Sequence, residues 1–193
     1  GAFFLQYLIF GLMLLFAKLK PLPFYKKTLR VQTLALATSS SKATIVAAIK
    51  DLQEKIGVSK HVANFVLPLG AVINMTGSAI YISACAIFFA QVIGVQLTIT
   101  QYLILIITST IGSIGAAGYP GGAVIMLGMV LPAVGLPIEG LPLILGIDRF
   151  VDMFRTAINV TGDCVVTVIV DKLDNSLDID RYNSCCDEQK IIL

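Results

Sequence analysis

The stretch "DRFVDMFRTAINVTGD", from Asp148 to Asp163, carries five polar residues at helical spacing: Asp148, Asp152, Arg155, Asn159 and Asp163. The intervals between them are four, three, four and four residues. At about 100° per residue, these intervals place all five on one helix face, within a stripe roughly 80° wide. Three acids, an arginine and an amide on a single face need polar partners if the helix lies out of water.

The surrounding chain is strongly apolar. Of 193 residues, 56% are hydrophobic and only 13% are charged, whereas a soluble domain typically carries about 25% charged residues. From His61 to Ile147 there is no lysine or arginine and a single acid, Glu139. This composition predicts an all-α integral membrane protein with several membrane elements, a multi-pass protein of the inner or plasma membrane.

Other classes of protein find little support. The four cysteines and the lone His61 lack metal-ligand spacing, and no phosphate-binding loop, nucleophile elbow or zinc-protease motif is present. We therefore predict no enzyme and no catalytic residue. The basic cluster between Lys18 and Arg30 follows an apolar run, which favours the cytoplasmic side of a membrane span over a nucleic-acid patch.

The chain divides into alternating long and short apolar segments. The polar run "TSSSK" interrupts one segment and "SIGAAGYPGG" another, and each leaves arms too short to cross about 30 Å of hydrocarbon. Such arms are expected to dip into the membrane and return. The predicted elements are a transmembrane helix at 1–19, a basic cytoplasmic loop at 20–30, a re-entrant hairpin at 31–57, a broken helix at 61–95, a second re-entrant hairpin at 98–137, a helix bearing the polar stripe at 139–172 and a cytoplasmic tail at 173–193.

The phrase Asn-x-Thr-Gly occurs twice, at Asn74–Gly77 and at Asn159–Gly162. Both copies match the N-glycosylation pattern, which would make them surface loops. Their apolar surroundings favour irregular helix centres inside the membrane instead. Paired interrupted segments in two halves of a chain indicate a secondary transporter built from inverted repeats.

The chemistry of the stripe indicates its ligand. A charge at membrane depth costs about 2.5–3.5 kcal/mol, so the stripe indicates either a substrate and ion pathway or a structural ion-pair network. Arg155 suits a carboxylate, and Asp152 could neutralise an ammonium group. Asn159 and Thr156 offer neutral hydrogen bonds, while Asp163 offers a hard oxygen ligand for a cation such as Na⁺. An acidic amino acid satisfies this set best.

Four stretches resemble the dicarboxylate/amino acid:cation symporter family, the glutamate and aspartate transporters: "TSSSKAT", "PLGAVINMTGSAIY", "AAGYPGGAVIMLGMVLPAVGLP" and "DRFVDMFRTAINVTGD". The similarity runs from about Val31 to Lys172. It implies the sixth helix, hairpin 1, helix 7, hairpin 2 and helix 8 of a homotrimeric elevator transporter, with the first five helices missing from this piece. It also implies an amino acid substrate, lipid surroundings, no nucleic acid, and Na⁺ as coupling ion, with H⁺ as the alternative.

The resemblance also implies the site residues, and it makes both Asn-x-Thr-Gly phrases unwound helix centres that turn peptide oxygens towards cations. Arg155 would hold the substrate's side-chain carboxylate and Asp152 its amine. The substrate-binding set is Ser39, Ser40, Ser78, Tyr119, Gly121, Asp152, Arg155, Thr156 and Asn159. The cation-binding set is Gly70, Val72, Asn74, Met75, Thr76, Ser113, Ala116, Asn159 and Asp163.

Two positions depart from the family pattern. Thr76 stands where the family usually has aspartate, which predicts fewer coupled sodium ions or partial proton coupling. Tyr119 stands where the second hairpin tip usually has a small apolar residue. The alternatives are a symporter of the same fold for a neutral amino acid, cystine or a C4-dicarboxylate, and a channel or non-transporting receptor. A pore would need rings of one charge sign, which the mixed stripe does not supply.

Overall fold

The computed structural model describes residues 1–115 and 122–184, and within these residues the fold is entirely helical. The elements are α1 (Ala2–Phe16), α2 (Pro21–Thr38), α3 (Ser41–Asp51), a π-helical turn η1 (Leu52–Ile56), α4 (Lys60–Ile73), α5 (Thr76–Val92), α6 (Ile99–Gly115), α7 (Gly122–Ala133), a 3₁₀ turn η2 (Ile138–Gly140), α8 (Leu141–Leu173) and α9 (Ile179–Asn183).

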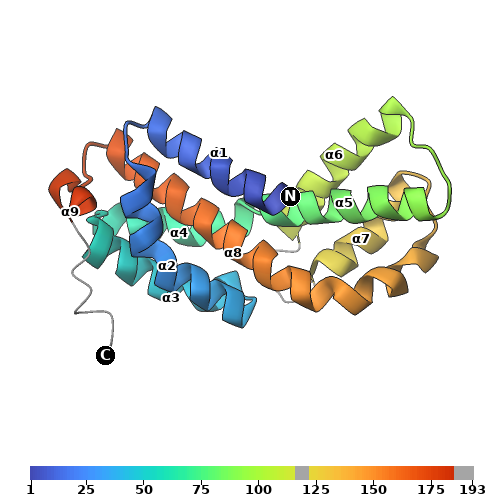
Figure 1. Ribbon diagram of the computed structural model, residues 1–193, viewed down its shortest axis with the longest axis horizontal. Coiled ribbons are helices and arrows are strands. Elements are labelled where there is room, and N and C mark those ends of the chain that lie inside the picture. The colour runs from blue at the N-terminus through green and yellow to red at the C-terminus, as the bar shows by residue number, and fades with distance from the viewer. Residues whose placement is uncertain (116–121, 185–193) are drawn as a thin grey trace.

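Helix α8 is the spine of the molecule. Its 33 residues correspond to a length of about 50 Å. Figure 1 shows α1, α2, α3 and α4 around the carboxyl half of α8, and α5, α6 and α7 around its amino half. Every one of these seven helices packs directly against α8 except α6, which packs on α5 and α7.

Two separate apolar cores form around this spine. The first joins α1 to α4 with the carboxyl half of α8, where Ile158, Cys164 and Val168 are buried. The second joins α5 to α7 with the amino end of α8 at Ile144. The polar stripe begins between the two cores with Asp148, Asp152 and Arg155. It continues with Asn159 and Asp163 into the part of α8 that contributes to the first core.

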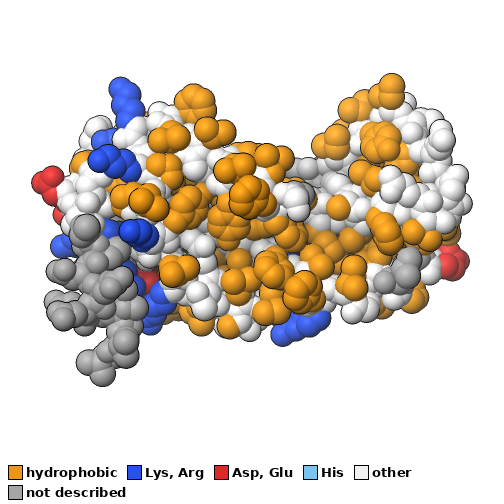
Figure 2. Space-filling view, viewed as in Figure 1, with side chains coloured by type: hydrophobic (Ala, Val, Ile, Leu, Met, Phe, Trp, Pro, Cys, Tyr) orange, Lys and Arg blue, Asp and Glu red, His pale blue; other side chains and the backbone are white. Residues whose placement is uncertain are grey.

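The outer surface is rich in large apolar side chains. On α1, the exposed set comprises Phe4, Leu5, Leu8, Ile9, Leu12, Met13, Leu15 and Phe16. Figure 2 shows apolar side chains spread over the visible face, with most Lys and Arg side chains gathered near the end where α1 meets α2. Two stretches, 60–92 and 144–173, are long and apolar enough to cross a membrane by length and composition.

The first Asn-x-Thr-Gly phrase interrupts a helix. Helix α4 ends at Ile73, and α5 begins at Thr76. Asn74 and Met75 adopt non-helical dihedral angles, with ψ values of 72° and 42°. The backbone amide of Asn74 still donates to the carbonyl of Gly70 at 2.7 Å, so the break is confined to about one turn.

The second phrase does not interrupt a helix, so the prediction of two unwound helices is wrong. Helix α8 continues without a break through Asn159–Gly162. The hydroxyl of Thr161 donates within its own helix to the carbonyl of Ala157 at 2.7 Å. Gly162 makes room for a close approach, since a Cβ built there would lie 2.8 Å from Asn74 Nδ2 and 2.9 Å from Phe10 Cζ. Glycine at this position leaves space for the neighbouring side chains, and the helix stays continuous.

The predicted loop at 20–30 is also wrong, because this segment forms the first half of α2. Pro21 stands at the first helical position, where its fixed φ is favourable and its missing N–H costs nothing. Helix α2 reaches Thr38 and turns into α3 through Ser39, which has a left-handed φ of 50°. The hydroxyl of Ser40 caps α3 by accepting from the amide of Ala43 at 3.3 Å. We call α2, α3 and η1 hairpin 1, and Ser39–Ser40 its tip.

Replacing Gly162 by alanine tests the close packing on α8. The added methyl group would press on Phe10 and Asn74, so we expect a loss of about 1–3 kcal/mol in the free energy of unfolding. Gly146→Ala on the same helix is the matched control, because a Cβ there meets no atom within 4 Å. Thermal unfolding in detergent should separate the two variants. Equal midpoints would contradict the close approach.

Candidate functional site

The polar stripe is buried along its whole length. Asp148, Asp152, Arg155, Asn159 and Asp163 are each at most 7% exposed. Buried charges are retained only when they are paired or hydrogen-bonded, because their desolvation costs several kcal/mol. The contacts of each residue therefore indicate what the stripe can do.

Arg155 lies at the centre of an incomplete polar cluster. Its Nη2 donates to the carboxylate of Asp152, and its Nη1 lies 3.8 Å from Asp148 Oδ1. The guanidinium also lies over the ring of Tyr81, 5.1 Å from the ring centroid. Arg155 Nη1, Asp148 Oδ1 and the hydroxyl of Tyr81 are buried and lack a hydrogen-bond partner. Arg155 Nη1 thus pairs with Asp148 but makes no hydrogen bond, so it can still donate to a further acceptor, such as a ligand carboxylate.

Asn159 joins α8 to the start of α5. Its Oδ1 accepts from the amide of Gly77 at 2.8 Å, and its Nδ2 donates to Ser78 Oγ at 3.2 Å and to Met75 Sδ at 3.2 Å. A Cβ built on Gly77 would lie 2.9 Å from the carbonyl of Arg155 and 3.1 Å from Asn159 Oδ1. Only glycine fits at this contact.

The two Asn-x-Thr-Gly phrases therefore contact each other reciprocally. The glycine of the first phrase, Gly77, makes room for Asn159, and the glycine of the second, Gly162, makes room for Asn74. Asn74 Nδ2 also donates to Asp163 Oδ1 at 3.0 Å. The two copies of the phrase thus pack against each other. This contact holds the break between α4 and α5 against the middle of α8.

Oxygen donors gather beside the break. A Cβ built on Gly70 would lie 2.9 Å from Asp163 Oδ1, so Gly70, Asn74 and Asp163 lie together. The hydroxyl oxygen of Thr76 is buried without a hydrogen-bond partner. One carboxylate with neutral oxygens fits a monovalent hard cation better than a divalent one. The described residues contain no cluster of three or more acidic, histidine or cysteine side chains.

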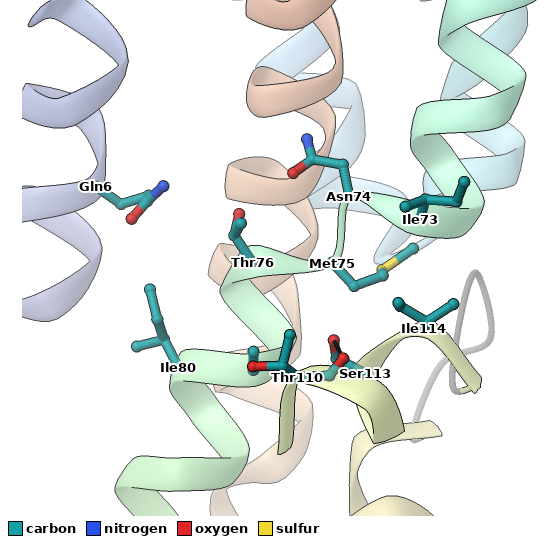
Figure 3. Close-up of a pocket in the computed structure, with 10 residues that line it drawn as sticks. Gln6, Ile73, Asn74, Met75, Thr76, Ile80, Thr110, Ser113 and Ile114 are labelled. Carbon is teal, nitrogen blue, oxygen red and sulfur yellow. Dashed lines mark hydrogen bonds between the residues drawn. The ribbon is translucent and has the colours of Figure 1, made fainter. Parts of the chain in front are cut away.

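A cavity of about 340 Å³ adjoins these donors. Figure 3 shows Gln6 reaching from α1 towards Asn74 and Thr76. The residues that line the cavity are Gln6, Ile73, Asn74, Met75, Thr76, Ala79, Ile80, Thr110, Ser113 and Ile114. Four predicted cation ligands therefore share one cavity. Sequence reasoning missed Gln6, although a lone amide in an otherwise apolar helix was a usable signal.

The remaining predicted site residues do not all lie at the stripe or at the cavity. Ser78 and Thr156 are buried beside the stripe, whereas the side chain of Val72 is 45% exposed and does not line the cavity. The carbonyl of Asn159 was predicted to be freed by an unwound helix, and the unbroken α8 contradicts this. Three predictions lie outside the described residues: Ala116, Tyr119 and Gly121.

The tip of hairpin 1 contributes two further hydroxyl groups, those of Ser39 and Ser40. Ser39 is 3% exposed and its hydroxyl lacks a hydrogen-bond partner, while the Ser40 hydroxyl caps α3. Among the described residues, no hydrogen bond or ion pair joins this tip to Arg155 or Asn159. The tip therefore offers one unused buried hydroxyl to a ligand.

Comparison with known proteins decides the family. Residues 1–173 match the sodium:dicarboxylate symporter family. The chain belongs to this family. The predicted resemblance is thereby confirmed, and the family and the relatives that match are transporters and not enzymes.

Its relatives in the sodium:dicarboxylate symporter family include transporters of two named kinds. Excitatory amino acid transporter 3 from Mus musculus is 47% identical over 139 residues, covering 72% of this chain and 27% of that protein. Excitatory amino acid transporter 1 from Homo sapiens is 43% identical over 161 residues, covering 81% and 30%. Neutral amino acid transporter A from Homo sapiens is 40% identical over 159 residues, covering 82% and 30%. The chain spans less than a third of the length of these relatives.

Replacing Asn159 by alanine tests the contact between α8 and α5. The substitution leaves the buried amide of Gly77 without its acceptor, which should lower the free energy of unfolding by about 1–3 kcal/mol. Asn64→Ala serves as the control, since Asn64 is exposed on α4. Denaturation should show a loss for Asn159→Ala alone. A loss of the same size in both variants would count against the contact.

Proposed function

We propose that this chain forms the substrate- and cation-binding core of a secondary active symporter that takes up an acidic amino acid together with Na⁺. The observation that carries the proposal is the buried Arg155, whose Nη2 donates to Asp152 and whose Nη1 lies 3.8 Å from Asp148 without making a hydrogen bond. An arginine held in this way can take a carboxylate from a ligand through its planar fork.

The two ends of the ligand follow from the charges on α8. Arg155 would bind the side-chain carboxylate of glutamate or aspartate, and Asp152 would bind its amine. Ser78, Thr156 and Asn159 lie buried nearby and would hold the main-chain carboxylate, together with the tip of hairpin 1. Among the predicted residues outside the described part of the chain, Tyr119 and Gly121 would close the pocket.

Sodium coupling is proposed from the donors beside the helix break. Asp163, Asn74 and the backbone around Gly70 would hold one ion, and the cavity lined by Met75, Thr76 and Ser113 would serve a second. The proposed backbone ligands of these ions also include Val72 and Ala116. Thr76 supplies a neutral hydroxyl where the family usually supplies a carboxylate, so fewer sodium ions, or H⁺ in part, would be coupled.

The wider transporter is also a proposal. We propose a homotrimer in the plasma or inner membrane that works by an elevator movement of this core, with the remaining helices supplied by a longer chain. The longer chain is supported by relatives that are more than three times as long as the matching segment.

A neutral amino acid is the second candidate substrate. The observation that favours it is the similarity to neutral amino acid transporters A and B(0), which are 40% and 41% identical over most of this chain. Against it stands Arg155, because a neutral side chain would leave the buried guanidinium without its ligand partner. Asp152 argues in the same way against a C4-dicarboxylate that lacks an amine.

Arg155→Ala tests the substrate in the full-length protein, meaning the longest chain that its gene encodes. We expect sodium-dependent aspartate uptake to fall roughly 10- to 100-fold, the loss typical of a charged hydrogen bond. Competition by serine should improve relative to aspartate.

Arg149→Ala is the matched control for this experiment, because Arg149 is exposed on the same helix. Arg155→Lys keeps the charge and guards against simple misfolding. Unchanged aspartate uptake in Arg155→Ala, at equal amounts on the cell surface, would remove Arg155 from the binding site.

Thr76→Asp tests the cation site. A carboxylate at this position should raise the apparent affinity for Na⁺ and the charge moved per substrate molecule, measured as the ratio of current to substrate flux. Thr98→Asp is the control, because Thr98 is exposed outside the site. If the unaltered protein and Thr76→Asp move the same charge per substrate, the proposed loss of sodium coupling is wrong.

A further inference from the structure

The segment after α8 folds back onto the base of hairpin 1. The chain reverses at Asn175, which has a φ of 58°, and the amide of Ser176 donates to the carbonyl of Asp171 at 3.0 Å. The segment then forms α9 beside the start of α2 (Figure 1). We call residues 174–184 the C-terminal latch. Sequence analysis predicted only a cytoplasmic tail here.

Tyr182 anchors the latch in the first apolar core. Its side chain is fully buried, and its hydroxyl donates to the carbonyl of Lys20 at 2.8 Å. Burial raises the pKa of Tyr182, so its hydroxyl keeps the proton that it donates. An aromatic ring of this size contributes a large share of local burial. The latch is thereby held to the amino end of α2.

Lys27 of α2 also binds the latch. Its side chain is only 5% exposed although it carries a charge. The ammonium donates to the carbonyl of Arg181, to the carbonyl of Tyr182 at 3.1 Å and to Ser184 Oγ at 3.2 Å. A lysine can donate three hydrogen bonds, and all three of these acceptors lie in the latch. Contact with lipid or solvent does not explain a lysine buried to this extent.

The latch also closes on the far end of hairpin 1. The amide of Asp178 donates to the carbonyl of Gly57 at 3.1 Å. Gly57 ends η1 with a φ of 89°, and a Cβ there would lie 2.8 Å from the Cβ of Asp178. The latch therefore contacts both ends of the hairpin, the start of α2 and the end of η1.

A shift at this base would reach the hairpin tip. Helix α2 is unbroken from Pro21 to Thr38, so Lys27 lies about 18 Å along the same rod from Ser39. Inside the base, Asp51 is buried and pairs with Arg30 at 3.3 Å and Lys55 at 3.0 Å. Both ends of hairpin 1 are thus held by contacts with the latch.

We propose that the C-terminal latch positions hairpin 1, and that Lys27 and Tyr182 are positioning residues for substrate binding at Ser39–Ser40. The role of the tip in substrate binding rests on the proposed function. The position of hairpin 1 itself does not, and it can be measured without transport.

A thiol-labelling experiment tests the position of the hairpin. Ala43→Cys, exposed one turn beyond the tip, is introduced into the full-length protein with Cys185 and Cys186 replaced by serine. Lys27→Met should raise the rate of labelling by a water-soluble maleimide roughly fivefold, the lower end of typical coupling between separate sites. Lys26→Met, the exposed neighbour, should leave the rate unchanged. Equal rates in both variants would overturn the proposal.

Uptake kinetics separate positioning from general stability. Lys27→Met should raise the KM for substrate roughly fivefold at an unchanged maximal rate per molecule on the surface. A purely structural role would reduce the number of molecules on the surface and leave KM as it was, and that result overturns the proposed part of Lys27 in substrate binding. Tyr182→Phe removes one hydrogen bond and keeps the ring, so it provides a milder variant if Lys27→Met fails to fold.

The two readouts also separate this proposal from the proposed function. Should no form of the protein transport an acidic or neutral amino acid, the proposed function fails while the labelling result still decides the position of hairpin 1. Transport with faster labelling but an unchanged KM would keep the latch as a structural element and remove its part in substrate binding.

Discussion

The fold depends on the reciprocal contact between the two Asn-x-Thr-Gly phrases. Each asparagine occupies the space that the glycine of the other phrase leaves free, and each amide group then bonds across the interface. Without Gly77 the start of α5 could not approach the carbonyl of Arg155, and without Gly162 the break after α4 could not approach Asp163. The substrate and cation donors of the proposed site are neighbours because this contact exists.

The contact also explains where the charges lie. Two apolar cores, one joining α1 to α4 with α8 and the other joining α5 to α7 with α8, leave a polar layer between them at Asp148, Asp152 and Arg155. Arg155 and its acids occupy this layer, where partners replace water. A stripe of charge would be unfavourable inside either core, since a buried ion without a partner costs several kcal/mol. Between the cores, the same charges can bind a ligand that carries charges of opposite sign.

Sequence reasoning predicted those features that depend on periodicity or local turn chemistry. The buried stripe followed from helical spacing, and the turn at Ser39–Ser40 followed from a polar run between apolar arms. It failed where tertiary contact decides. The same phrase breaks the helix at Asn74 and leaves α8 intact at Asn159, although both asparagines bond across the same contact.

The latch was missed for the same reason. Nothing local distinguishes Lys27, which is buried against α9, from the exposed Lys26 beside it. Gln6 was missed although its isolation in an apolar helix offered a signal.

The uninterrupted course of α8 has a consequence for how such a chain can vary through evolution. Between Asp148 and Asp163, a single inserted or deleted residue would rotate everything beyond it by about 100° and turn the later donors into an apolar core. Substitutions here would alter ligand preference, whereas changes in length would abolish the site. The exposed connection at 93–98 has no such restriction. Differences in length among related chains should therefore occur there and not within α8.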